Sequence, residues 1–261
     1  MSQLIKTPAE IAKIRQAGQI VGSVLADLAA LVICGARPHD LDQYARETIR
    51  QRGGQPAFIG YQGYPATLCI SVNNAVVHGL PTAKQFVDGD LVGIDAGAIV
   101  DGWYADAAIT LGVGQISVKD QHLLTTTQEA LQAGIVRARA GRRLGDVQAA
   151  IQRVIEAAGL GIIRDLTGHG IGRQLHEEPQ IPNYGRAGSG LLLQKGLVIC
   201  LEPMVTLGSP EIVLDQDRWT IRTLDGSKGA QFEHTILITD DDAEILTPLR
   251  AWPEPESLVR G

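Results

Sequence analysis

The sequence predicts an α+β fold whose two halves are related by an internal repeat. Apolar residues recur at helical spacing in two separate stretches, and strand-like segments follow each of them. No low-complexity linker divides the chain, which argues for one domain. The 261 residues, 44% hydrophobic and 20% charged, have the length and composition of a folded globular protein.

The first fifty residues are expected to form two helices. Apolar residues between Ile11 and Leu31 recur at intervals of three and four, which places them on one helix face. Gly35 interrupts this pattern, and Asp40 is the expected N-cap of a second helix that ends at Gly53-Gly54.

This pattern returns later in the chain. Gly141 stands 106 residues after Gly35, and Asp146 stands the same distance after Asp40. A further helix, over about residues 119–138, precedes the second copy. An internal duplication explains this register and predicts a site between the halves. Two unrelated helical hairpins with ordinary caps would explain it as well.

Strands are expected where β-branched and aromatic residues gather. These segments are Ala66–Val72, Leu91–Ile99, Trp103–Leu111, Val198–Leu201 and Gln231–Ile238. We expect residues 1–250 to form the single domain and residues 251–261, which contain two prolines, to form a loose tail.

Charge and cysteine content exclude several classes of function. The net charge is −6 and no basic cluster is present, so nucleic-acid binding is not expected. Three widely spaced cysteines indicate reduced thiols. We see no signal peptide, and the apolar stretch Val24–Ala36 is too short to span a bilayer. A cytoplasmic protein without membrane contact is therefore expected.

Two aspartates fall within a predicted β-hairpin. If Asp101-Gly102 forms its two-residue turn, Gly97 lies opposite Asp106 and Ala108 opposite Asp95. The two aspartates then share a face as diagonal neighbours, roughly 7–8 Å apart at the backbone. Aspartate is uncommon in strands, and a buried carboxylate is costly unless it is paired or binds a metal.

Three further residues interrupt apolar or glycine-rich segments. Glu202 ends the run Val198–Leu201, Glu233 lies in a strand-like segment, and His169 stands between two glycines. Each alone would fit an ordinary edge or loop residue. With the two aspartates they supply four carboxylates and one imidazole, a ligand set that suits Mn, Fe or Co, with Zn possible. Several carboxylates commonly hold two metal ions about 3.5–4 Å apart.

These motifs resemble the methionine aminopeptidases, in the short bacterial-style subgroup. The resemblance runs from about residue 4 to residue 248. It rests on these strings: Ser71-Val72-Asn73, His78-Gly79-Leu80-Pro81, His176-Glu177-Glu178-Pro179, Pro182-Asn183-Tyr184-Gly185, Glu202-Pro203-Met204 and Gln231-Phe232-Glu233-His234-Thr235.

The resemblance implies the family's pita-bread fold, a duplicated α/β arrangement around a central antiparallel sheet. It implies two divalent metal ions (Co, Mn, Fe or Zn), with two of the five ligands bridging them. The implied ligands are Asp95, Asp106, His169, Glu202 and Glu233. Asp106 and Glu233 would bridge, Asp95 would clasp one ion, and Glu202 would also handle a proton in catalysis.

The resemblance also implies a substrate cleft. His176 would contact the scissile amide and His78 would hold the peptide or the leaving group. A methionine pocket would be lined by Phe58, Tyr61, Tyr64, Cys69 and Trp219, where aromatic rings favour contact with the thioether sulfur. Without the motifs, these histidines and aromatic residues would be read as ordinary core.

The expected activity is removal of the initiator methionine from nascent chains and methionyl peptides. A hydroxide held between the metals would attack the carbonyl of the first residue, and a small second residue would be preferred. The protein is expected to act as a monomer. Leu175, Asn74, Ala75 and Lys228-Gly229 depart from the family pattern and put substrate preference in question.

Other functions explain the sequence less well. Proline-directed peptidases share the fold and the ligands but usually carry an extra N-terminal domain, and this chain has the methionine-type string at 182–185. A non-catalytic binding protein of the same fold would typically have lost ligands. A two-carboxylate glycosidase would not explain the histidine or the remaining acids.

Overall fold

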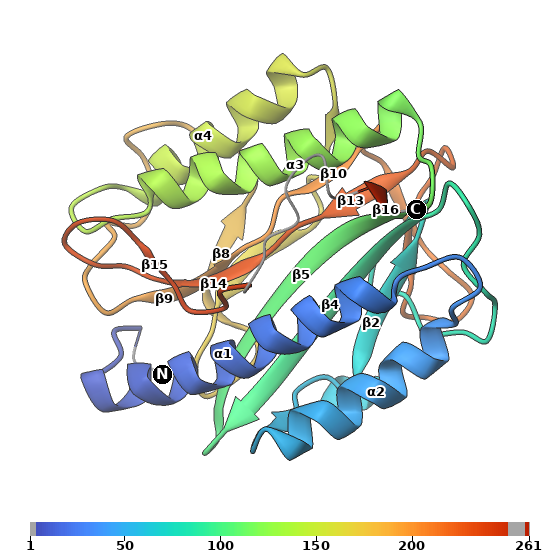
Figure 1. Ribbon diagram of the computed structural model, residues 1–261. Helices are drawn as coiled ribbons and strands as arrows, with labels where there is room; N and C mark the ends of the chain where they lie inside the picture. Colours follow the sequence, from blue (N-terminus) through green and yellow to red (C-terminus); the bar gives the residue numbers. More distant parts are fainter. Residues whose placement is uncertain (1–3, 250–258, 261) are drawn as a thin grey trace.

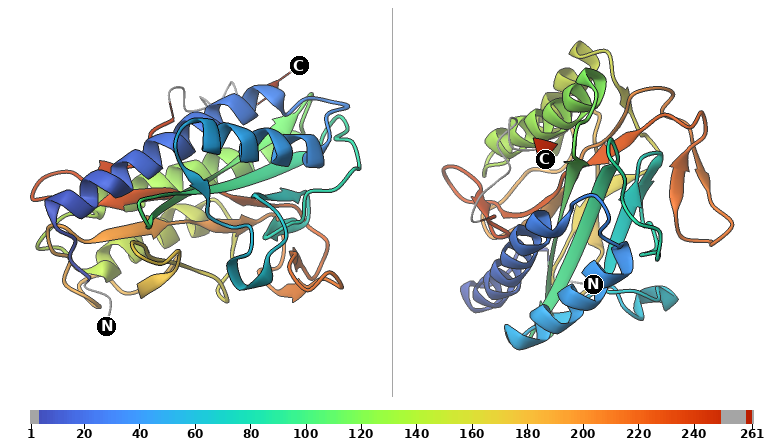
Figure 2. Two further views of the ribbon diagram at one scale, coloured as in Figure 1. Left: turned by 90° about the horizontal axis from the view of Figure 1, so that it is seen from below. Right: turned by 45° about the vertical axis from the view of Figure 1, so that its right-hand side comes forward.

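Two pairs of helices flank the strands in the structure, a computed structural model in which residues 4–249 and 259–260 are described. The first pair is α1 (Pro8–Leu31) and α2 (Pro38–Gln51), and the second is α3 (Val118–Arg137) and α4 (Leu144–Ala157). Figure 1 shows the first pair in blue below the strands and the second in green above them. The right-hand view of Figure 2 keeps strands between the two pairs.

The predicted duplication is confirmed by the helices and their boundaries. Helices α2 and α4 each contain 14 residues. Gly35 and Gly141 precede them with φ of +89° and +82°, and Gly53 and Gly159 follow with φ of +85° and +72°. These left-handed angles favour glycine, so the repeated glycines mark equivalent turns in both halves.

The prediction that Asp40 caps α2 was wrong. The helix begins at Pro38 with Arg37 as its N-cap, which makes Asp40 the third helical residue. Proline suits the first turn because its φ is already helical and its missing N–H is not needed there. Asp146 takes the same third position in α4, where its carboxylate accepts a hydrogen bond from the Arg143 N–H at 3.0 Å.

The first half is built on the long hairpin β4 (Leu91–Val100) and β5 (Trp103–Val113), and α1 packs against both strands. The short strands that pair with this hairpin are β1 (Gln55–Pro56) and β2 (Leu68–Val72) along β4, and β16 (Val259–Arg260), parallel to β5. Of the tail predicted to be loose, residues 251–258 and 261 lie outside the described residues.

The second half contributes a five-stranded sheet. Its order is β15 (Glu244–Ile245), β14 (His234–Leu237), β9 (Val198–Leu201), β7 (Thr167–Gly170) and β8 (Glu177–Pro182). Two three-stranded sheets complete the described strands: β13 (Gly229–Gln231) with β10 (Met204–Thr206) and β6 (Gly161–Ile162), and β11 (Ile212–Leu214) with β12 (Ile221–Thr223) and β3 (Ala75–Val77).

One buried apolar cluster joins the two halves. It includes Leu25 and Leu28 of α1, Ile94 and Ile109 of the long hairpin, and Ile151 of α4. The long hairpin and helices of both halves are therefore packed on a common core. None of the described helices has the length and apolar character that a membrane span requires.

Candidate metal centre

The hairpin β4–β5 places two carboxylates on one face. Its turn is Asp101-Gly102, with φ of +50° and +77°, as a two-residue hairpin loop requires. Gly97 pairs with Asp106, and Asp95 pairs with Ala108. The predicted register is confirmed, and both aspartates line the same cavity.

Both glutamates lie where strands break. The chain leaves β9 at Leu201 and resumes in β10 at Met204, and it leaves β13 at Gln231 and resumes in β14 at His234. The sequence had predicted one continuous strand over 231–238, and this was wrong. In the second break the Glu233 N–H donates to the Ala108 carbonyl of β5 at 2.8 Å. The chain thus crosses from one sheet to another, and the break brings the glutamate to the hairpin.

His169 is the point on which the other ligands converge. It lies on β7, and its Nδ1 is 3.0 Å from the Gly170 carbonyl oxygen. Its Nε2 is 3.7 Å from Asp106 Oδ2, 3.6 Å from Glu202 Oε1 and 3.8 Å from Glu233 Oε1. Asp95 lines the same cavity, so the structure brings all five predicted ligands together.

The acids of this cluster disfavour one another's charge. Burial raises the pKa of Asp95, Glu202 and Glu233 well above the usual carboxyl range, and repulsion from neighbouring carboxylates raises it further. Burial also raises the pKa of Asp106, while the charge of His169 and hydrogen bonds from Cys200 and Thr235 oppose that rise. A multivalent cation would reverse this balance by stabilising the charged forms.

The cluster also contains carboxylate oxygens that lack a hydrogen-bond partner. Asp95 Oδ1 and Glu233 Oε1 are buried without a hydrogen-bond partner. Unsatisfied buried oxygens are costly, and a metal ion is one of the few groups that can satisfy several at once. The residues present therefore fit divalent metal ions, and their oxygen-rich set with one nitrogen matches the chemistry expected from the sequence.

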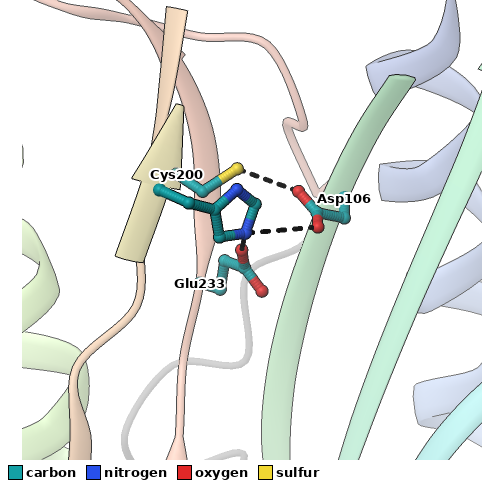
Figure 3. A group of neighbouring side chains, drawn as sticks. Asp106, Cys200 and Glu233 are labelled. Carbon is teal, nitrogen blue, oxygen red and sulfur yellow. Dashed lines mark hydrogen bonds and ion pairs between the residues drawn. The ribbon is translucent and has the colours of Figure 1, made fainter. Parts of the chain in front are cut away.

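Sequence reasoning missed three residues that support the ligands. The Cys200 thiol lies 2.9 Å from Asp106 Oδ1, and Figure 3 shows its sulfur pointing at that carboxylate with Glu233 nearby. The Thr235 hydroxyl accepts from the Asp106 N–H at 3.1 Å, and Gln231 Nε2 donates to Glu202 Oε2 at 3.2 Å. Period-two alternation could have indicated them, because each lies two residues from a ligand glutamate.

The predicted pocket residues line the same cavity as the acids. Phe58, Tyr61, Tyr64, Cys69 and Trp219 all contribute to its wall. Tyr64 and Trp219 pack edge to face with ring centroids 5.1 Å apart. Residues that the sequence did not assign to the wall are Gln62, Val77, Leu166, Thr167 and Met204.

Two histidines complete the cavity. His176 is exposed to it, and its Nδ1 lies 2.8 Å from the Tyr61 hydroxyl. The surrounding walls displace water and lower the pKa of His176 to about 4, and the charges of His169 and His78 contribute. His78 has a left-handed φ of +58°. The next residue is fixed by hydrogen bonds, since the Gly79 N–H donates to Ser71 Oγ at 3.1 Å and its carbonyl accepts from the Ile70 N–H at 2.8 Å.

The positions that depart from the family pattern separate into two groups. Leu175 is buried and lines the cavity. Asn74 instead accepts from Arg222 Nη1 at 3.1 Å, and Lys228 Nζ donates to the Gly89 carbonyl at 2.8 Å. Leu175 is the one of these departures that lines the ligand cavity among the described residues.

Comparison with known proteins agrees with this geometry. The model of the family described as metallopeptidase family M24 matches residues 12–240. Methionine aminopeptidase 1 of Mycobacterium tuberculosis is 46% identical over 249 residues, which cover 93% of this chain and 94% of that protein. Methionine aminopeptidase 1 of Bacillus subtilis is 42% identical over 244 residues, with 94% and 98% covered.

Solved structures confirm the pita-bread fold. The methionine aminopeptidase from Thermotoga maritima superposes with a TM-score of 0.92 at 46% identity, covering 94% of this chain and 98% of that one. The prolidase from Pyrococcus furiosus gives 0.75 at 26% identity, covering 95% of this chain and 66% of that one. The family match over most of the chain and the convergent ligand set lead to one conclusion: this chain belongs to metallopeptidase family M24.

Proposed function

We propose that this protein is an aminopeptidase that removes N-terminal methionine from peptides and newly made proteins. The observation that carries the proposal is one cavity lined both by the five metal-ligand candidates and by an apolar, aromatic wall. An aromatic and sulfur-containing wall suits a thioether side chain.

Asp95, Asp106, His169, Glu202 and Glu233 would hold two divalent ions drawn from Mn, Fe, Co or Zn. When bound, such ions supply Lewis-acid polarisation of a carbonyl and acidify a water molecule. One buried carboxylate oxygen in each of Asp95 and Glu233 lacks a hydrogen-bond partner, which supports this assignment.

Glu202 is the proposed proton acceptor from the attacking water. Gln231 fixes its Oε2 at 3.2 Å and Asn183 Nδ2 donates to its carbonyl oxygen at 3.0 Å, so one carboxylate oxygen is held in place.

His176 is the proposed hydrogen-bond donor to the scissile amide. Its lowered pKa keeps the ring neutral at pH 7. If the Tyr61 hydroxyl donates to Nδ1, the ring proton lies on Nε2, which can then donate to substrate. His78, on the same cavity, would hold the peptide.

The rival function is proline-directed hydrolysis, because prolidases share the fold. Sequence identity favours the methionine-specific group, at 46% for the Thermotoga maritima structure against 26% for the Pyrococcus furiosus prolidase. The test is methionine release from Met-Ala-Ser and alanine release from Ala-Pro-Ala by apo-protein reloaded with Mn, Co, Fe or Zn. Cleavage of the methionyl peptide alone supports the proposal, and cleavage of the prolyl peptide alone assigns the protein to the rival group.

A small second residue is the proposed preference. Met-Ala-Ser and Met-Leu-Ser, assayed side by side with the same loaded protein, test it. The proposal expects a higher kcat/KM for the alanyl peptide, and equal values would overturn it.

A further inference from the structure

A buried ion pair includes Glu177, the residue that directly follows the cavity-lining His176. Lys6 Nζ is 2.7 Å from Glu177 Oε2, and the two side chains are only 4% and 2% exposed. These residues are 171 positions apart in sequence. Burying such a pair gives little net stability compared with apolar residues, so its presence calls for another explanation.

The carboxylate of Glu177 organises the turn that carries His176. Its second oxygen, Oε1, accepts from the Arg173 N–H at 2.7 Å and from the Gln174 N–H at 3.1 Å. This turn, residues 171–176, joins β7, which bears the ligand His169, to β8, which begins at Glu177. The Glu177 side chain therefore binds the backbone just before His176 with one oxygen and Lys6 with the other.

Lys6 is itself fixed on both sides. Its N–H donates to the Gly196 carbonyl at 2.8 Å, beside the bridge between Ile5 and Leu197. The next residue, Thr7, is the N-cap of α1 within a capping box. A Cβ atom at Gly172 would lie 2.6 Å from Lys6 Cε and 2.8 Å from its Nζ, so the turn closes tightly over the ammonium.

We propose that Lys6 and Glu177 are positioning residues that set the place of His176 in the cavity. The inference rests on the proposed function, in which His176 meets the substrate. His176 is exposed and is contacted from the cavity side by Tyr61 and His169. The backbone just before His176 is fixed by the hydrogen bonds that Glu177 accepts from the turn. The ion pair with Lys6 fixes the Glu177 carboxylate in turn.

The first experiment replaces Lys6 with methionine, which keeps an unbranched side chain of nearly the same length and removes its charge. The uncompensated carboxylate of Glu177 is expected to move toward water and to loosen the turn. Displacement of a substrate-contacting group by about 1 Å can lower the rate about a hundredfold. We therefore expect kcat for Met-Ala-Ser to fall about a hundredfold, while the affinity of the apo-protein for Mn²⁺, measured by calorimetry, stays at the wild-type value.

The matched control is Lys195→Met. Lys195 also pairs with a carboxylate, Asp240, but both side chains are more than 60% exposed and neither lines the cavity. This variant should keep wild-type kcat and Mn²⁺ affinity. If wild type and control both fail to cleave the methionyl peptide, the proposed function fails, and the positioning inference is rejected with it.

Two neutral double variants separate positioning from stability. Lys6→Met with Glu177→Gln retains a side-chain oxygen that can accept from the two turn N–H groups, and Lys6→Met with Glu177→Ala does not. Both lack a buried charge, so they also serve if Lys6→Met alone does not fold. We expect the glutamine variant to keep kcat within about tenfold of wild type and the alanine variant to lose about a hundredfold.

The kcat values of these variants distinguish a positioning role from a role in stability alone. Equal kcat in the two folded, metal-loaded double variants would show that the pair contributes only to stability. Wild-type kcat in folded Lys6→Met would overturn the proposal directly.

Discussion

The two halves of the repeat have equivalent helix pairs but contribute to the metal centre in different ways. In the first half, Asp95 and Asp106 lie on one unbroken hairpin whose register a two-residue turn fixes. In the second half, His169, Glu202 and Glu233 come from three separate segments, and both glutamates lie at strand breaks. The same architecture therefore supplies a rigid pair of ligands from one half and three separately placed ligands from the other.

The difference indicates that the ligands of the second half are placed by contacts with the first half. The Glu233 N–H donates to the Ala108 carbonyl at 2.8 Å, and the Gln231 N–H donates to Thr110 Oγ1 at 3.1 Å. The Thr235 hydroxyl donates to the Asp106 carbonyl at 2.7 Å. Strand β5 is thus the support against which the loosely connected ligands are ordered, and Asp106 is the point where both halves meet.

The largest expected loss of activity comes from substituting Asp106, the ligand that contacts both halves. Asp106→Asn removes a charge from the centre of the ligand set while keeping the shape of the side chain. Losing several kcal/mol of metal-dependent stabilisation should lower kcat/KM for a methionyl peptide by at least about a thousandfold. Metal content by atomic emission and kinetics measure this. Asp240→Asn, at an exposed position, is the control, and equal activity of the two variants would contradict the account.

Removing the metal should expose the repulsion between the halves. Burial raises the pKa of Asp95, Glu202 and Glu233 in the folded protein, so the folded state binds more protons than the unfolded chain above the ordinary carboxyl range. Stability of chelator-treated protein should therefore fall as pH rises from about 4 toward neutrality.

Metal-loaded protein should lack this fall, because cations take the place of the protons. Thermal unfolding between pH 5 and pH 8, with and without Mn²⁺, measures the difference. Identical pH dependence of Tm for the two forms would count against the acid cluster as a metal site.

A smaller effect is expected at Cys200, which links β9 of the second half to Asp106 of the first. Its thiol lies 2.9 Å from Asp106 Oδ1, so Cys200→Ala removes a hydrogen bond to a ligand. Loss of such support typically weakens metal binding about 10–100-fold. Cys200→Ser keeps a donor and should stay closer to wild type. Calorimetric titration with Mn²⁺ compares the three proteins, and equal affinity in all of them would refute the supporting role.

The smallest effect concerns the cavity wall. Leu175 is buried against the cavity, and Leu175→Phe adds volume there. A change of one or two methylene equivalents in an apolar pocket shifts discrimination by roughly 10–200-fold at most. We expect a several-fold change in the ratio of kcat/KM for methionyl and norleucyl peptides, without loss of metal. An unchanged ratio would remove Leu175 from the specificity pocket.

The contrast between the halves also explains what the sequence could predict. The Asp95–Asp106 register followed from a local turn, and the 106-residue repeat followed from glycines that need left-handed angles. The break at Phe232–Glu233 could not be predicted, because it depends on the chain crossing to a strand more than a hundred residues away. Local pattern also assigned Asp40 wrongly, since Pro38 begins the helix earlier. The pairing of Lys6 with Glu177 has no local signal at all.

The most direct test of the account is a titration of apo-protein with Mn²⁺, in which metal bound and methionine released from Met-Ala-Ser are measured in the same samples. The account predicts that release begins only as metal binds and that Asp106→Asn abolishes both. Stoichiometric binding of metal without any release of methionine would contradict it.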